Sequence, residues 1–207
     1  AESSMTVQEL LALQPGDIIQ TSKPAKEEVL LRIEGKNKFA GRMGKHKNPV
    51  AAIEIARQAG MPIQLAGEPQ TAAEREFFNE RVQPLFDDED VGYLGAADFV
   101  LKNELLRHAA ALVFPIQWEE PFGNVMVEAM ACGTPVIACR RGSVAEVVEP
   151  GVTGFHADSL EEMAALVPQA LELDRRRVRE RARERFSNER MATDYIQVYR
   201  NLLARDS

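Results

Sequence analysis

The sequence is poor in cysteine and lacks long hydrophobic runs. It has two cysteines, Cys132 and Cys139, among 207 residues. Two cysteines are too few for a disulfide scaffold or a cysteine-based zinc site. No stretch approaches the roughly 18 consecutive apolar residues of a membrane-spanning helix. These absences predict a cytoplasmic protein, in a reducing compartment, without a membrane span.

Aromatic side chains and positive charge are also scarce. The chain has one tryptophan and three tyrosines, and 25 Lys and Arg residues against 32 Asp and Glu residues give a net charge of −7. Nucleic-acid-binding domains typically carry a basic surface, so we expect no nucleic-acid partner. The hydrophobic share of 45% is instead typical of a globular protein with one full domain.

The charge and the local pattern both change near residue 48. Residues 1–48 hold eight basic and six acidic residues, whereas the rest of the chain holds 17 and 26. The first part is turn-rich, with a strand predicted at residues 29–33 and a hairpin partner at residues 38–42. So short a segment buries too little surface to be stable alone. We therefore expect it to pack against the second part.

The first segment also carries a resemblance. Its letters ELLALQPGDII, then KP, then VLLRIEGKNKFAGRMG, within about residues 5–45, resemble the first half of a SpoA domain. That domain ends the flagellar motor switch protein FliM and its relatives, where it forms intertwined dimers. The resemblance implies a SpoA-like fragment at residues 1–40, a possible homodimer through it, and a fused or engineered, chimera-like chain.

The second part alternates strand and helix patterns, which predicts an α/β fold with a Rossmann-like parallel sheet and helices on both faces. Residues 151–157 are expected to form an extended turn. The expected strands are residues 62–67, 91–95, 111–115 and 135–139, and the expected helices are residues 50–59, 71–85, 101–109, 122–131, 160–173, 174–186 and 188–203.

Ligands of such sheets bind beyond the carboxyl ends of the strands. The densest chemistry there is the run EEPFGNVMVEAMACGTPV, which begins at Glu119. Pro121 and Gly123 favour a tight turn into a helix, whose amino end attracts phosphate. Glu120 and Glu128, eight positions apart, could hold sugar hydroxyls. Spacing alone also allows solvated glutamates, with Glu128 bonded to backbone.

This run, extended as EEPFGNVMVEAMACGTPVIACRRGSVAEVVEPGVTGF, resembles the signature of the retaining GT-B glycosyltransferases of family 4. The letters GRMGKHKNPVAAIEIARQAGMPIQLAG, from Gly41, are similar to the opening element of their donor-binding half. Residues 39–47 therefore have two interpretations, as the second hairpin strand of the SpoA-like segment or as the first strand and phosphate loop of this half. The resemblance covers residues 41 to about 204. It implies a nucleotide-sugar-binding domain at residues 41–207, which is the carboxyl-terminal half of a GT-B enzyme.

The resemblance also implies a role for each matching residue. Glu120 would be the catalytic residue at the donor sugar, and Glu128 would bind the ribose hydroxyls. Arg42 and Lys47 would neutralise the diphosphate, since cations there stabilise the leaving group. The remaining donor-binding positions would be Gly95, near the base, and Phe122, Gly123 and Asn124, at the sugar or phosphate. No cofactor or metal is implied; the ligand is a nucleoside-diphosphate sugar.

In the GT-B family the acceptor binds mainly in an amino-terminal half, and the residues matched here are those of the donor half. We therefore expect nucleotide-sugar binding and little transfer by this chain alone, because catalysis requires both reactants to be held. One alternative is a transferase that becomes active with a separate acceptor-binding chain. Another is a structural module that dimerises through the SpoA-like segment.

The last helices are the final candidate for an interaction surface. In intact relatives they often cross to the other half of the enzyme. We expect exposed apolar side chains there to support homodimerisation. The candidates are Tyr195, Ile196, Tyr199, Leu202 and Leu203.

Overall fold

The computed structural model describes residues 38–42, 45–86 and 90–204, with backbone alone for residues 38–42 and for Lys45. The chain divides into two compact units, one of residues 28–182 and one that contains residues 1–27 and 183–207. The SpoA-like assignment of residues 1–37, including the strand expected at residues 29–33, lies outside the described residues. It stays a prediction.

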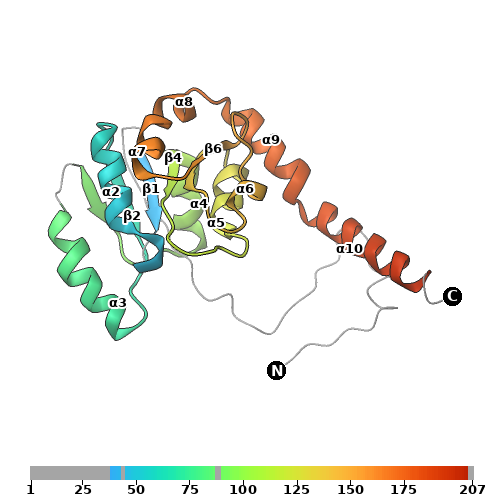
Figure 1. Ribbon diagram of the computed structural model, residues 1–207, viewed down its shortest axis with the longest axis horizontal. Helices are drawn as coiled ribbons and strands as arrows, with labels where there is room; N and C mark the ends of the chain where they lie inside the picture. The colour runs from blue at the N-terminus through green and yellow to red at the C-terminus, as the bar shows by residue number, and fades with distance from the viewer. Residues whose placement is uncertain (1–37, 43–44, 87–89, 205–207) are drawn as a thin grey trace. The chain divides into compact units, whose positions relative to one another are not determined.

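The larger unit is built on a six-stranded parallel sheet (Figure 1) with the strand order β3-β2-β1-β4-β5-β6. This order is that of the doubly wound dinucleotide-binding fold, so the predicted Rossmann-like α/β class is confirmed. The strands are β1 (Lys38–Arg42), β2 (Ile63–Ala66), β3 (Val91–Tyr93), β4 (Ala109–Phe114), β5 (Val136–Cys139) and β6 (Gly154–Ala157).

Strand β1 corrects the predicted hairpin. It pairs in parallel with β2, where Arg42 lies opposite Ala66, and in parallel with β4, where Phe39 lies opposite Ala111. Both edges of β1 are therefore occupied, so residues 38–42 cannot be the antiparallel partner of a strand at residues 29–33 in this sheet. The hairpin prediction was wrong because a short strand pattern does not reveal its partner. The alternative interpretation of residues 39–47, which begins with the first strand of the donor-binding half, agrees with the parallel pairing of β1.

Strand β6 is a second correction. We expected residues 151–157 to form only an extended turn, but Gly154–Ala157 pairs with β5 along its whole length. Gly154 makes this possible, because a Cβ there would lie 2.7 Å from the backbone nitrogen of Val136. The strand was missed because its burial is mixed and its sequence is short.

Helices cover both faces of the sheet (Figure 1). Helices α2 (Pro49–Gln58), α7 (Leu160–Ala165) and α8 (Val167–Leu171) pack on one side, and α4 (Phe99–His108) and α5 (Asn124–Ala131) lie together on the other. The remaining α-helices are α3 (Ala72–Phe77), α6 (Val144–Val147), α9 (Arg175–Phe186) and α10 (Asn188–Leu203). Short 3₁₀ helices lie at Lys45–Lys47 and Gln83–Leu85, and a π-helix at Phe78–Val82 continues α3.

Local sequence explains where these helices begin and end. The Thr71 hydroxyl accepts a hydrogen bond from the backbone nitrogen of Glu74, and the Glu74 carboxylate accepts one from the backbone nitrogen of Thr71, which together form a capping box. The helix expected at residues 160–173 is divided between α7 and α8 at Leu166. Pro168 favours a new helix start there, since it has no backbone donor.

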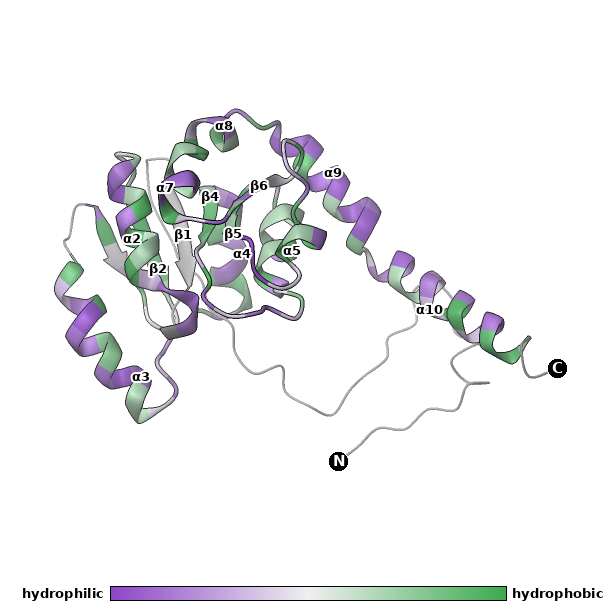
Figure 2. Cartoon of the chain, viewed as in Figure 1, coloured by the Kyte–Doolittle hydropathy of each residue, from purple (hydrophilic) through white to green (hydrophobic). Residues whose placement is uncertain are grey.

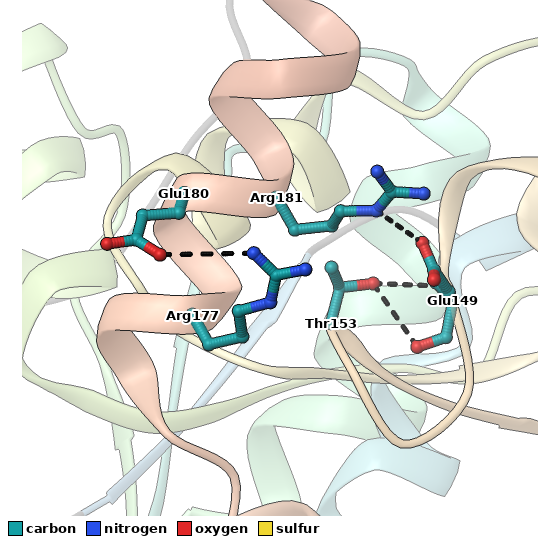
Figure 3. A network of polar contacts seen from close by, with 5 residues as sticks. All are labelled: Glu149, Thr153, Arg177, Glu180 and Arg181. Atoms are coloured by element: carbon teal, nitrogen blue, oxygen red, sulfur yellow. Dashed lines mark hydrogen bonds and ion pairs between the residues drawn. The ribbon is translucent and has the colours of Figure 1, made fainter.

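Helix α9 is hydrophilic over most of its length (Figure 2) and is held by polar contacts. The Arg175 guanidinium donates to the carbonyls of Ala109 and Arg107, at 2.6 Å and 2.7 Å, and to the Thr134 hydroxyl at 2.8 Å. Six residues further on, Arg181 Nε lies 2.7 Å from Glu149 Oε2, and Thr153 Oγ1 accepts from the Glu149 backbone nitrogen (Figure 3). These contacts hold α9 through backbone carbonyls and through the side chains of Thr134 and Glu149.

The second unit is described from Arg183 to Ala204 and contains α10. None of the α10 side chains is buried. Its apolar side chains Met191, Tyr195, Val198 and Leu202 are each at least half exposed and recur at helical spacing. Of the residues predicted to be exposed there, Tyr195, Leu202 and Leu203 are, whereas Ile196 and Tyr199 are half-buried. No helix in the described part of the chain combines the length and hydrophobicity needed to span a membrane.

Candidate functional site

The candidate site lies where the strand order reverses, between β1 and β4. The segments after these two strands meet there, because the backbone nitrogen of Gln117 donates to the carbonyl of His46 at 3.0 Å. In open α/β sheets, the crevice at the carboxyl ends of such a pair of strands is the usual ligand site. Two buried or half-buried lysine–glutamate pairs flank this point of the sheet.

The first pair joins Lys47 to Glu120. The Lys47 ammonium contacts Glu120 Oε2, and the two side chains are only 6% and 9% exposed. The Trp118 indole nitrogen donates to the same oxygen at 3.1 Å, and its ring lies 4.9 Å from the ammonium. Trp118 therefore contacts both members of the pair, Glu120 through the indole N–H group and Lys47 through the face of the ring.

Backbone from a third loop encloses Glu120. The backbone nitrogen of Ser143 donates to the Glu120 carbonyl at 2.8 Å, and that of Gly142 donates to Glu119 Oε2 at 2.5 Å. Gly142 has a φ of 53°, and a Cβ there would lie 2.5 Å from the Glu120 nitrogen. Only glycine permits so close an approach in this backbone conformation. The residue 140–143 loop thus fixes the backbone that carries Glu120.

The amino end of α5 is suited to bind an anion. Gly123 caps the helix with a φ of 75° and provides no side-chain hydrogen bond to its first amide groups. A Cβ on Gly123 would also lie 3.2 Å from Glu120 Cγ. The first amides of a helix attract phosphate through their free N–H groups and the positive end of the dipole. The sequence-based expectation of a glycine turn into a helix is confirmed by this geometry.

The second pair joins Lys102 of α4 to Glu128 of α5. The Lys102 ammonium lies 2.5 Å from Glu128 Oε1, and the two side chains are 14% and 32% exposed. Glu128 Oε2 is buried and has no hydrogen-bond partner among the residues that the structure describes. The alternative in which Glu128 bonds to backbone does not match this arrangement. A buried acceptor without a partner calls for an explanation.

The other predicted site residues lie around these two pairs. Arg42 ends β1 at the switch point, but its side chain is not among those described. Gly95 follows β3 with a φ of 70°, and its carbonyl accepts from the Gly67 nitrogen at 3.0 Å. Phe122 and Asn124 are exposed beside Gly123. Their ligand contacts stay predictions.

Neither Lys102 nor Gly142 was singled out from the sequence. Lys102 is one of several polar residues of α4, and its partner is 26 residues away. Only the packing of α4 against α5 brings the two side chains together. Within the described residues, no cluster of three or more His, Cys, Asp or Glu side chains could hold a metal ion.

A hollow of about 290 Å³ lies elsewhere in the same unit, near the amino ends of the strands. It is lined mainly by apolar side chains and by Arg175, whose guanidinium contacts backbone carbonyls of the unit. It has none of the lysine–glutamate pairs of the switch point. The switch point is therefore the better candidate for polar ligand binding.

Comparison with known proteins decides the family. The model of the family described as "Glycosyl transferases group 1" matches residues 23–185. The chain belongs to this family. The match starts within the segment for which sequence analysis predicted a SpoA-like fragment, and no comparison supports a SpoA domain. The glycosyltransferase resemblance is confirmed at the level of the family.

Characterised group 1 relatives share sequence with most of the chain. The N-acetyl-alpha-D-glucosaminyl L-malate synthase of Bacillus anthracis is 34% identical over 60% of this chain and 34% of its own length. The alpha-maltose-1-phosphate synthase of Mycolicibacterium smegmatis is 31% identical over 80% of this chain and 48% of its own length. The chain thus spans half or less of these curated relatives.

Solved glycosyltransferases share the fold. Anabaena HepE in complex with UDP-glucose superposes with a TM-score of 0.64 over 81% of this chain and 49% of its own, at 23% identity. AviGT4, a glycosyltransferase of avilamycin A biosynthesis, gives a TM-score of 0.62 over 80% of this chain and 51% of its own, at 27% identity. The GT-B type of α/β architecture is therefore shown.

Proposed function

We propose that this chain binds a nucleoside-diphosphate sugar at the carboxyl ends of β1 and β4, as the donor-binding half of a retaining glycosyltransferase. The observation that carries the proposal is the Lys47–Glu120 pair beside the uncapped amino end of α5. A buried cation and free helix amides are suited to a diphosphate. The structural neighbour HepE binds UDP-glucose and UDP, which supports this ligand class.

Glu120 and Lys47 would act at opposite ends of the bond that breaks. In a retaining transfer the diphosphate leaves with negative charge while positive charge develops on the sugar carbon. An ammonium near the diphosphate and a carboxylate near the sugar stabilise these charges. Arg42, at the end of β1, would add a second cation at the diphosphate. We expect turnover to require an acceptor-binding half, because one wall holds one reactant.

Binding is tested by titrating UDP, GDP and ADP while recording backbone amide shifts. We expect saturable shifts at Lys47 and at Gly123–Val125, with no change at Val178 in α9. The double variant Lys47→Met, Glu120→Gln removes both charges, so that neither is left buried and unpaired. It should weaken binding about tenfold or more, since a charged hydrogen bond contributes roughly 1.5–3 kcal/mol.

Arg176→Met is the matched control, because Arg176 is an exposed cation of α9. Its affinity should equal that of the parent chain. Absence of saturable shifts in a folded parent chain would contradict the proposal. Equal affinity in the double variant would show that binding occurs away from the Lys47–Glu120 pair. Addition of a separate acceptor-binding half then tests whether transfer appears.

A further inference from the structure

Glu128 is an incomplete hydrogen-bonding group in the structure. Its Oε1 is taken by the Lys102 ammonium, and its Oε2 is buried without a partner among the described residues. Leaving a buried carboxylate oxygen unsatisfied destabilises the folded state, more so for a charged group. A donor from a ligand would satisfy Oε2. The pair lies between α4 and α5, the two helices that follow β3 and β4 toward the proposed donor site.

The Lys102 ammonium has hydrogen-bond donors to spare, whereas Glu128 has an acceptor to spare. An ammonium has three N–H donors and no acceptor, and the structure gives it one hydrogen bond, to Glu128 Oε1. Its side chain is 14% exposed, so little water reaches it. The pair therefore presents one buried acceptor and further donors side by side. A hydroxyl group matches this arrangement, because it donates one hydrogen bond and accepts others.

We propose that Lys102 is a specificity-determining residue, which fixes Glu128 through Oε1 so that Oε2 accepts from one ribose hydroxyl while the ammonium donates to that hydroxyl oxygen. The inference rests on the proposed nucleotide binding and assigns the selection of ribose over deoxyribose to Lys102. A nucleotide without that hydroxyl leaves Oε2 unsatisfied. A site built for a hydroxyl rejects the analogue that lacks it, because buried polar groups are then left unpaired.

The test compares dissociation constants for UDP, 2′-deoxy-UDP and 3′-deoxy-UDP by calorimetry, or for the GDP or ADP series if the parent chain prefers that base. In the parent chain we expect one of the deoxy analogues to bind about tenfold to a hundredfold more weakly. In Lys102→Met, that ratio should fall to about threefold or less, while affinity for the same deoxy analogue changes little. A merely structural role for Lys102 would weaken all three ligands equally.

Two further variants keep the result interpretable. Arg107→Met removes a cation from the same helix, where Arg107 is 66% exposed and lies 3.9 Å from Glu104, and should keep the parent ratio. Lys102→Gln retains a donor for Oε1 without the charge, and it replaces Lys102→Met if thermal melts show that variant to be unfolded. The Gln variant should show a partial loss of the ratio.

The outcomes separate this inference from the proposed function. If the parent chain binds no nucleoside diphosphate, both are overturned. If the parent chain binds and selects the ribonucleotide, but Lys102→Met and Lys102→Gln keep the full ratio, only the role of Lys102 is overturned. A ratio that falls in both lysine variants and persists in Arg107→Met supports the inference.

Discussion

At two glycines, Gly142 and Gly151, a side chain would be unfavourable for different reasons. Gly142 and Gly151 both have positive φ values, 53° and 75°, and both are exposed. A Cβ at Gly151 would meet nothing within 4 Å, whereas one at Gly142 would lie 2.5 Å from the Glu120 nitrogen and 2.8 Å from the Glu119 carbonyl carbon. Comparison of the two positions therefore distinguishes the cost of a strained backbone from the cost of a steric overlap.

We therefore expect Gly151→Ala to lower the free energy of unfolding by about 1–2 kcal/mol, from the left-handed backbone alone. Gly142→Ala should add an overlap of roughly 1–3 kcal/mol and move the backbone of Glu120. Urea unfolding measures the first effect and nucleotide titration the second. Equal stabilities for the two variants, with unchanged nucleotide affinity, would show that the residue 140–143 loop does not hold Glu120 in place.

The residues of the site differ in how visible they are in the sequence. Glu120, Gly123 and Glu128 belong to one short run, so their types and spacing were sufficient to predict a helix start and two carboxylates. Their partners were not predictable in the same way. Lys47 is 73 residues from Glu120, and Lys102 is 26 residues from Glu128. The resemblance identified Lys47, whereas nothing in the local pattern distinguished Lys102 from a surface lysine.

At the scale of elements, α9 depends on one arginine. Arg175 donates to two carbonyls and to the Thr134 hydroxyl, and burial lowers the pKa of its guanidinium below the ordinary value. The guanidinium remains charged across the accessible pH range. Its function is to satisfy acceptors near the start of β4, where chain segments from three parts of the sequence meet.

Removal of this side chain should be costly. Arg175→Met leaves these acceptors without their donor, so we expect a loss of about 2–4 kcal/mol in the free energy of unfolding. Arg175→Lys should recover little, because an ammonium lacks the planar fork of donors. Arg176→Met, at the exposed neighbouring position, should stay within about 0.5 kcal/mol of the parent. Chemical denaturation distinguishes these outcomes, and equal midpoints for the Met variants at 175 and 176 would refute the assignment.

Element boundaries show the limits of sequence reasoning. The capping box at Thr71 and the parallel α/β class were accessible, the first from local chemistry and the second from the regular alternation of patterns. The pairing of β1 and the existence of β6 were not. Strand β1 is identified by its neighbours β2 and β4 rather than by its own letters, and β6 is short with two half-buried positions. Both depend on tertiary context.

At the scale of the whole molecule, α10 leaves an apolar stripe uncovered. Met191, Tyr195, Val198 and Leu202 follow one face and are 50–57% exposed. Exposed stripes of this kind favour association, and the homodimer expected from the sequence stays a prediction.

The double variant Tyr195→Glu, Leu202→Glu should lower the concentration-dependent mass seen by sedimentation. Gln197→Glu, Asn201→Glu places the same charges outside this stripe and should have little effect. A parent chain that is monomeric at all concentrations would refute the prediction.

The position of β1 has a consequence for how the protein is made. During synthesis β1, β2 and β3 leave the ribosome before β4, and the edge of β1 that later receives β4 is unpaired until residues 109–114 emerge. Three strands can form one half of the sheet, and β4–β6 then dock along that single open edge. The proposed nucleotide crevice lies at this seam between early and late halves. It therefore exists only once the seam has closed, and the first half alone provides no place for the ligand.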